Sequence, residues 1–247
     1  MKNKIPKLLI ICSTHGDEKI GLEVVKQLKS NGLESFFDIL IANPRANEKN
    51  VRYIEKDLNR SYPGEKNSDI YEERLAFKNL EIAKKYQYII DIHEADEGRD
   101  DFIIIPRKKM SNKFPLEFID LKRVLLWPDP KGPIGSVLEN SIELEFGSKN
   151  RDRGEMIEKA TTIIKNFIVL TSKEQPKISY LRKDIYFVYG KVEISNFSGE
   201  IKELVDFEEY NEGNEKFIPL LTGQYLKSGI ICYKMEKQYR TIAGKLK

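Results

Sequence analysis

The 247-residue chain contains two histidines, His15 and His93, and each follows a short apolar run. His15 comes after the run at residues 7–12, and Glu18 lies three residues further on. Over the first turn of a helix, an imidazole and a carboxylate at that spacing can face the same point. Together with His93 they would supply two nitrogens and one oxygen, a ligand set typical of catalytic zinc with a fourth position left for water. The sequence therefore predicts a metal centre at these three residues.

A structural alternative exists for each histidine taken alone. Histidine is intermediate in its preference for burial, so a single one is more often an ordinary packed or surface side chain. His93, however, follows a second strand-like run at residues 88–90 and is itself followed by Glu94. Two histidines at strand ends, one with a carboxylate three residues on, favour the metal centre.

The second stretch suited to chemistry is residues 141–147, Ser-Ile-Glu-Leu-Glu-Phe-Gly. Alternation along a strand places the apolar side chains on one face and both Glu143 and Glu145 on the other. Because burying unpaired charge is costly, one interpretation is an edge strand with a solvated face. The other places Glu145 as a general base beside a water activated by the metal, where it accepts and later donates a proton.

Three polar residues, Arg52, Asn59 and Arg60, are candidates for holding an anionic substrate. They lie in a charged segment, residues 45–64, that shows little periodicity. The planar fork of arginine suits a carboxylate and can polarise a carbonyl group. On spacing alone, a solvated surface loop is the simpler interpretation of this segment.

The elements that must position these residues alternate between strands and helices. This alternation predicts an α/β fold, with a mostly parallel or mixed sheet flanked by helices. The histidines would then lie in the crevice outside the carboxyl ends of the strands. Apolar runs predict strands at 7–12, 36–41, 88–93, 102–105, 124–127 and 141–146, and apolar periodicity predicts helices at 20–28, 71–86 and 156–170.

The character of the chain changes near residue 172. Residues 173–177 are polar and typical of a linker, whereas residues 184–195 and 229–235 predict short strands with no convincing helix. We therefore expect two domains: an α/β catalytic domain over residues 1–172 and a β-rich C-terminal domain over residues 173–247.

Composition excludes several classes of partner. Hydrophobic residues make up 40% and charged residues 33% of the chain, as in soluble globular proteins. The net charge is +3 without a basic tail, so we expect neither nucleic acid nor a membrane as partner; homo-oligomerisation stays open. No apolar run approaches the ~20 residues of a membrane span, and no signal peptide is evident. Two cysteines, Cys12 and Cys232, are too few for a disulfide framework and indicate a reducing cytoplasm.

Five short motifs follow one another along residues 8–150. In that order they strongly resemble the aspartoacylase/succinylglutamate desuccinylase family, which is related to the zinc carboxypeptidases. The β-rich C-terminal part is similar in kind to the C-terminal domain of that family. The motifs are His15-Gly16-Asp17-Glu18, Asn43-Pro44-Arg45-Ala46, Arg52-Tyr53-Ile54 with Asp57-Leu58-Asn59-Arg60, Asp91-Ile92-His93, and Glu145-Phe146-Gly147.

The resemblance implies a zinc carboxypeptidase-like fold that binds one zinc ion through His15, Glu18 and His93. It also implies that Glu145 promotes the attack of water on an amide. The expected activity is zinc-dependent hydrolysis of an N-acyl amino acid, or of a similar small amide, to a carboxylate and a free amine.

The resemblance further implies roles for residues that bind the substrate. Arg52 would polarise the scissile carbonyl, while Asn59 and Arg60 would hold the carboxylate of the amino acid. Tyr210 resembles the tyrosine that the C-terminal domain of the family lends to the substrate pocket.

Departures from the family pattern bear on the substrate. Aspartoacylase proper carries a further arginine, about ten residues before the catalytic glutamate, that reads the acidic side chain of N-acetylaspartate. Residues 134–137 carry no basic side chain, which argues against that substrate. Asp17 stands where asparagine is common in the family. Two alternatives stay open: a metallocarboxypeptidase acting on short peptides, and a non-catalytic homologue that binds zinc or another ligand.

Overall fold

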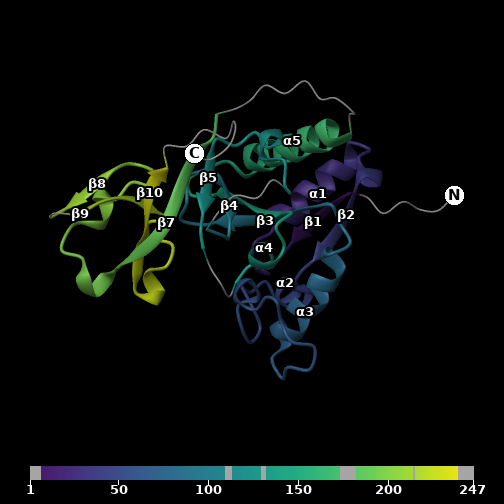
Figure 1. The fold of residues 1–247 in the computed structure, drawn as a ribbon, viewed down its shortest axis with the longest axis horizontal. Helices are drawn as coiled ribbons and strands as arrows, with labels where there is room; N and C mark the ends of the chain where they lie inside the picture. The colour runs from purple at the N-terminus through teal and green to yellow at the C-terminus, as the bar shows by residue number, and fades with distance from the viewer. Residues whose placement is uncertain (1–6, 109–112, 129–131, 173–181, 214, 239–247) are drawn as a thin grey trace.

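The protein forms one large sheet with helices on both of its faces (Figure 1). The structure is a computed structural model that describes residues 7–108, 113–128, 132–172, 182–213 and 215–238. Its strands are β1 (Leu8–Cys12), β2 (Phe37–Ile41), β3 (Tyr88–Ala95), β4 (Asp101–Ile105), β5 (Arg123–Leu126), β6 (Ser141–Gly147), β7 (Asp184–Glu193), β8 (Tyr210–Glu212), β9 (Glu215–Leu220) and β10 (Ile230–Gln238). Its helices are α1 (Ile20–Ser30), α2 (Pro44–Lys49), α3 (Tyr71–Ala83), α4 (Ile134–Val137) and α5 (Arg153–Ser172).

The sheet is mixed, and its order is β2-β1-β3-β6-β4-β5-β7-β10-β9-β8. Strand β1 pairs in parallel with β2 and β3, and β3 pairs in parallel with β6. Strand β4 runs antiparallel to β6, and β7, β10, β9 and β8 are antiparallel to one another in turn. The prediction of an α/β fold with flanking helices and a β-rich C-terminal part is confirmed.

The apolar run of β1 is buried on both faces of the sheet. Leu8, Ile10 and Cys12 pack on the side of α1 and α5, whereas Leu9 and Ile11 pack on the side of α3. This two-sided burial explains why the strand is continuously apolar instead of alternating. It also fixes where β1 ends, and therefore where the polar residues that follow it emerge.

Strand β7 joins the two predicted parts of the chain. Its first residues, 184–187, pair in parallel with β5, and residues 185–193 pair with β10 with two register shifts. Side chains from β4, β5, β9 and β10 share one apolar cluster with Tyr186 and Val188. The predicted boundary between residues 172 and 173 and the predicted linker at 173–177 lie next to or outside the described residues, so the division into domains stays a prediction.

The charged segment that was interpreted as a loop contains a helix. The side-chain oxygen of Asn43 accepts a hydrogen bond from the backbone N–H of Ala46 (3.3 Å), and Pro44 stands at the first helical position of α2. Both are helix-start signals, although α2 is too short to show an apolar period. The short strands β8 and β9 were likewise not predicted.

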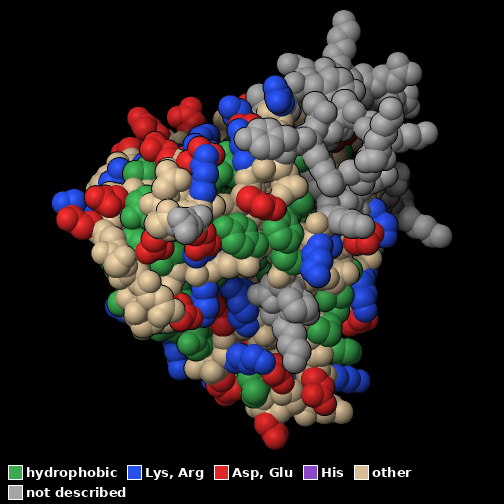
Figure 2. Space-filling view, turned by 60° about the vertical axis from the view of Figure 1, so that its left-hand side comes forward, with side chains coloured by type: hydrophobic (Ala, Val, Ile, Leu, Met, Phe, Trp, Pro, Cys, Tyr) green, Lys and Arg blue, Asp and Glu red, His purple; other side chains and the backbone are tan. Residues whose placement is uncertain are grey.

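The surface agrees with the near-zero charge balance. Figure 2 shows Lys and Arg side chains interspersed with Asp and Glu on the face that it displays. In the part of the chain that the structure describes, every helix is too short or too polar to cross a membrane.

The turn between β1 and α1 packs closely against α2 through Gly16. An added Cβ at this position would lie 2.1 Å from the carbonyl carbon of Ala46. The backbone N–H of Gly16 also donates a hydrogen bond to the carbonyl of Arg52 (3.2 Å). A glycine is therefore required where this turn meets the segment that follows α2.

We predict that Gly16→Ala destabilises the protein by about 1–3 kcal/mol or more, because backbone atoms must move to accommodate the methyl group. Thermal denaturation measures the change. Gly154→Ala in α5 is the matched control: its nearest neighbour is a side-chain oxygen of Asp152 at 3.1 Å, and the expected change is neutral or stabilising by up to about 1 kcal/mol. A Gly16→Ala protein as stable as the wild type would contradict this account of the turn.

Candidate active site

The predicted metal ligands meet at the carboxyl ends of neighbouring strands. His15 and Glu18 lie in the turn that follows β1, and His93 lies on β3, which pairs directly with β1. The prediction placed Glu18 within the first turn of a helix. The structure corrects this detail, because α1 begins at Ile20 and a turn closed by Glu18 N–H and His15 C=O (3.2 Å) brings the two side chains together.

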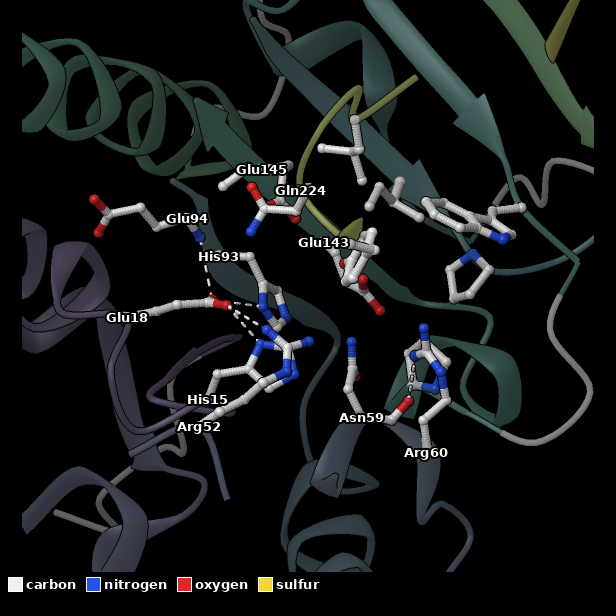
Figure 3. A pocket seen from close by; sticks show the side chains of 17 residues that line it. His15, Glu18, Arg52, Asn59, Arg60, His93, Glu94, Glu143, Glu145 and Gln224 are labelled. Atoms are coloured by element: carbon white, nitrogen blue, oxygen red, sulfur yellow. Dashed lines mark hydrogen bonds and ion pairs between the residues drawn. The ribbon is translucent and has the colours of Figure 1, made fainter. Parts of the chain in front are cut away.

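The carboxylate of Glu18 lies between the two imidazoles (Figure 3). His15 Nδ1 is 2.6 Å from Glu18 Oε1, and His93 Nδ1 is 2.9 Å from Glu18 Oε2. The backbone N–H of Glu94 donates a further hydrogen bond to Oε2 (3.1 Å). Among the described residues, these three side chains form a buried group whose candidate ligand atoms all lie within 4.8 Å of one another.

Each histidine also has a carboxylate beside its other ring nitrogen. His15 Nε2 lies 3.1 Å from Asp57 Oδ1. His93 Nε2 lies 3.3 Å from Asp91 Oδ2, close enough for an ion pair although not aligned as a hydrogen bond. Asp91 in turn accepts a hydrogen bond from the hydroxyl of Thr14 (2.9 Å). Carboxylates in this position orient metal-binding imidazoles and fix which nitrogen is available as a ligand.

The contacts of the two imidazoles with Glu18, and of His93 with Asp91, shift the pKa values of these groups. Burial opposes the charged form of His93, but Asp91 and Glu18 overcome it and raise its pKa well above the ordinary value. Burial likewise opposes ionisation of Glu18, yet the two imidazoles lower its pKa below the ordinary range. The site therefore keeps an ionised carboxylate between two nitrogen donors.

This donor set fits a zinc ion. Two imidazole nitrogens and one carboxylate oxygen are a known ligand set of catalytic zinc. Calcium and magnesium prefer sites built from oxygen alone. The group is also buried beneath a cavity, so a bound ion would have one side open to a substrate.

The segment that carries Arg52 and Asp57 is held by one buried carboxylate, Glu72 of α3. Glu72 Oε1 accepts a hydrogen bond from the backbone N–H of Ile54 (2.7 Å), and Oε2 accepts from those of Glu55 (3.2 Å) and Lys56 (3.1 Å). Three consecutive N–H groups thus converge on one fully buried side chain. The sequence-based reasoning missed Glu72, which appeared only as part of a helix.

Arg52 lies beside the group formed by His15, Glu18 and His93, which we call the metal group because it could hold an ion. Its Nη1 is 3.6 Å from Glu18 Oε1, and its Nε and Nη2 both donate to Asp57 Oδ2 at 3.3 Å. Asn59 and Arg60 are on the 3₁₀ turn Leu58–Arg60 and line the same cavity on the side away from Glu18 (Figure 3). The structure therefore brings all three predicted substrate-binding residues of this segment to the cavity.

Glu143 and Glu145 both line the cavity from β6. Strand β6 lies in the middle of the sheet between β3 and β4, so the alternative of a solvated edge strand is wrong. Glu145 stands opposite His93 in the register of β3 and β6. Burial, together with the nearby carboxylates of Glu18 and Glu143, raises the pKa of Glu145 to about 8.

The C-terminal part closes one side of the cavity with Leu221, Gln224 and Tyr225. Their turn is fixed by Asp206, whose carboxylate accepts hydrogen bonds from the backbone N–H groups of Leu221 (2.8 Å) and Thr222 (3.0 Å). Burial raises the pKa of Tyr225 to about 12, so its hydroxyl stays protonated at neutral pH.

The structure does not bring Tyr210 to the cavity. Tyr210 lies on β8 and packs against Phe197 and Phe217, with ring centroids 6.2 and 5.6 Å apart. Tyr225 lines the cavity instead. Nothing local in the sequence separates Tyr225 from the other tyrosines of the chain, because its position depends on the distant carboxylate of Asp206.

Comparison with known proteins agrees with these observations. The family profile described as "Succinylglutamate desuccinylase/Aspartoacylase catalytic domain" matches residues 4–122, a range that includes His15, Glu18, Arg52 and His93. A probable aspartoacylase of Prochlorococcus marinus (strain MIT 9215) is 29% identical over 124 residues, which cover 44% of this chain and 40% of that protein.

Two further proteins are similar over nearly all of the chain. The N-acyl-aromatic-L-amino acid amidohydrolase (carboxylate-forming) of Xenopus tropicalis is 25% identical over 273 aligned positions, covering 95% of this chain and 86% of that protein. The crystal structure of murine aminoacylase 3 superimposes with a TM-score of 0.74 at 18% identity and covers 100% of both chains. The similarity to murine aminoacylase 3 shows that the two chains share the same fold.

We predict that Glu72→Gln lowers the free energy of unfolding by about 1–3 kcal/mol, because the amide turns an N–H toward backbone donors that need an acceptor. The segment holding Arg52 and Asp57 then loosens, so any catalytic turnover should fall as well. Chemical denaturation and a turnover assay measure the two effects.

Glu81→Gln, on the exposed face of the same helix, is the matched control and should change neither quantity; Glu81 pairs only with the exposed Lys84 in the described structure. An undisturbed Glu72→Gln protein would show that the segment is held in some other way.

Proposed function

Because the chain belongs to the aspartoacylase/succinylglutamate desuccinylase family, we propose that it is a zinc-dependent hydrolase that cleaves the amide bond of an N-acyl amino acid or a similar small amide. The observation that carries this proposal is the His15–Glu18–His93 group at the floor of a cavity that Glu145 also lines. The relatives named as amidohydrolase and aspartoacylase support the same class of reaction.

In this proposal the three ligands hold one zinc ion per chain. Zinc in such a site supplies a Lewis acid for the amide carbonyl and makes water a stronger nucleophile near neutral pH. The carboxylates of Asp57 and Asp91, each beside one of the two imidazoles, would hold those rings in place as ligands.

Glu145 is the proposed general base and acid. It accepts a proton from the attacking water and delivers that proton to the nitrogen of the leaving amine. Its place opposite His93 in the sheet register supports this role, because the carboxylate then lies beside the metal group. A pKa raised by burial also suits a group that must both take and return a proton near neutral pH.

The remaining polar residues orient the substrate. Arg52, beside Glu18, stabilises the negative charge that develops on the carbonyl oxygen. Asn59 and Arg60, further from the metal group, hold the carboxylate of the amino acid. Tyr225 takes the role that the sequence suggested for Tyr210, since Tyr225 lines the cavity and burial keeps its hydroxyl protonated at neutral pH.

The part of the cavity wall that comes from the C-terminal part of the chain favours a small substrate rather than a long peptide. Leu221, Gln224 and Tyr225 border the cavity, and Gln224 Oε1 is tied by a hydrogen bond from the backbone N–H of Glu97 (2.7 Å). This contact links the wall to the catalytic part of the sheet and limits the room on that side. We also propose a reducing cytoplasm as the location, supported by two cysteines that are both free and buried.

We predict that the purified protein contains about one zinc per chain and that His93→Ala loses most of it, because two remaining ligands hold zinc poorly. Elemental analysis after gel filtration measures the content. The folded control is Ser195→Ala, a change on the exposed surface, which should keep full zinc content. Full zinc content in His93→Ala would refute the assigned ligand set.

We predict that Glu145→Gln keeps zinc but lowers kcat by about 10²–10⁴-fold, because the amide cannot accept the proton. A screen of N-acetyl, N-succinyl and N-formyl amino acids, with release of free amine as the readout, measures turnover. Glu139→Gln, an exposed glutamate before β6, is the control and should retain activity. Full activity in Glu145→Gln would contradict the role given to this residue.

A further inference from the structure

One acidic side chain in the cavity has no part in the proposed hydrolysis. Glu143 lies two residues before Glu145 on β6, and both side chains line the same cavity. Only 3% of Glu143 is exposed. Among the described residues its carboxylate has no hydrogen-bond partner for the buried oxygen Oε1. Figure 3 shows the side chain directed into the cavity, on the side of Asn59 and Arg60.

A buried carboxylate oxygen for which the described residues supply no hydrogen-bond partner needs an explanation. Leaving such a group unpaired is costly, and burial accordingly raises the pKa of Glu143 to about 7. When Glu143 is ionised its oxygens only accept hydrogen bonds, and a cation beside them favours that ionised form, so a cationic N–H donor is the partner that fits this position. Asn59 Oδ1 is a second buried acceptor without a partner that lines the same cavity. Two unfilled acceptors point to a ligand that brings N–H groups.

Apolar side chains also line this cavity, and one of them, Ile104, stands opposite Glu143 in the register of β4 and β6. Such side chains can pack against methylene groups, and the face of Trp127 can also attract a cation. Arg60, which we assign to a carboxylate, lies on the same side of the cavity. This region therefore offers a place for an anion, a place for a cation and an apolar surface. The apolar lining residues are Ile104, Pro106, Trp127, Pro133 and Leu221.

We propose that Glu143 is a specificity-determining residue that binds a protonated amine on the amino-acid half of the substrate, which makes the substrate a mono-acylated diamino acid. This inference rests on the proposed deacylase function and specifies its substrate class. The ammonium group would pair with the Glu143 carboxylate while the substrate carboxylate meets Arg60.

Two kinds of molecule carry this chemistry. An amino acid acylated at its α-nitrogen keeps an ammonium group on its side chain, whereas one acylated at the side-chain nitrogen keeps its α-ammonium group. Nα-acetyl-lysine and Nε-acetyl-lysine represent the two. Their neutral counterparts are Nα-acetyl-norleucine and 6-acetamidohexanoate, which lack the free amine but keep the chain length.

The first test measures kcat/KM for these four compounds with the zinc-loaded protein and with Glu143→Gln. For at least one pair, the cationic compound should be favoured over its neutral counterpart by about 10–100-fold, the range of a charge-assisted hydrogen bond. Glu143→Gln should remove that preference, so that the cationic and neutral compounds of the pair then have kcat/KM values within about twofold of each other. The pair that shows the preference identifies which nitrogen is acylated.

The second test does not depend on turnover. Isothermal titration of the zinc-loaded protein should give a Kd for lysine about tenfold or more below that for norleucine, and Glu143→Gln should equalise the two. The control Glu139→Gln, with its exposed side chain, should bind both like the wild type.

The outcomes separate the two proposals. Hydrolysis of acylated amino acids without any preference for the cationic member of either pair overturns the role of Glu143 and leaves the deacylase intact. A preference that persists in Glu143→Gln also overturns it, since a neutral side chain would then suffice. If none of the acylated amino acids is hydrolysed, the deacylase proposal fails, and the lysine–norleucine titration still decides whether Glu143 binds an ammonium group.

Discussion

The contact on which the rest of the site depends is the one between the Glu18 carboxylate and the two imidazoles of His15 and His93. The two histidines are far apart in sequence, and they meet because β1 and β3 are neighbouring parallel strands whose carboxyl ends share an edge of the sheet. Burial of β1 on both faces fixes the point at which the chain emerges into the turn that carries His15 and Glu18. Once these three groups face one another, two imidazole nitrogens and one carboxylate oxygen are placed where they could act together as the ligands of one cation.

Around this contact, the same kind of interaction occurs at two places: a carboxylate accepts hydrogen bonds from the backbone N–H groups of a segment elsewhere in the sequence. Glu72 gathers three successive N–H groups of the segment that carries Arg52 and Asp57. Asp206 holds the turn that places Tyr225 on the cavity wall. Such anchors satisfy donors that would otherwise be buried without partners, and they give irregular segments the rigidity that substrate-binding residues require. Glu143 differs from these anchors because no hydrogen bond to its buried oxygen is found in the described residues, which is why we assign its partner to the substrate.

The sequence predicted the sheet, its flanking helices and the three side chains that the structure brings together, His15, Glu18 and His93, because each lies on or beside an element with a local signal. Apolar runs and periodicity reveal strands and helices. The chain has only two histidines, and both follow an apolar run, so their shared position at strand ends is easy to recognise. The roles of Glu72 and Asp206 could not be predicted, because a carboxylate that binds distant backbone leaves no periodic trace. The sequence suggested Tyr210 as the tyrosine of the cavity, whereas Tyr225 lines it. The position of Tyr225 depends on the hydrogen bonds from its turn to Asp206, which the sequence does not reveal. Whether Glu143 faced solvent or the cavity was also undecidable from alternation, since it depends on β3 and β4 flanking β6 on both sides.

The most direct test of the central claim is a zinc titration of the metal-free protein, with release of free amine from a pool of N-acetylated amino acids measured at each addition. The account predicts that activity rises in proportion to added zinc and reaches a plateau near one equivalent per chain, as expected for a single catalytic site. Amine release by the metal-free protein that added zinc does not change would contradict the account, because the His15–Glu18–His93 group would then have no part in the reaction.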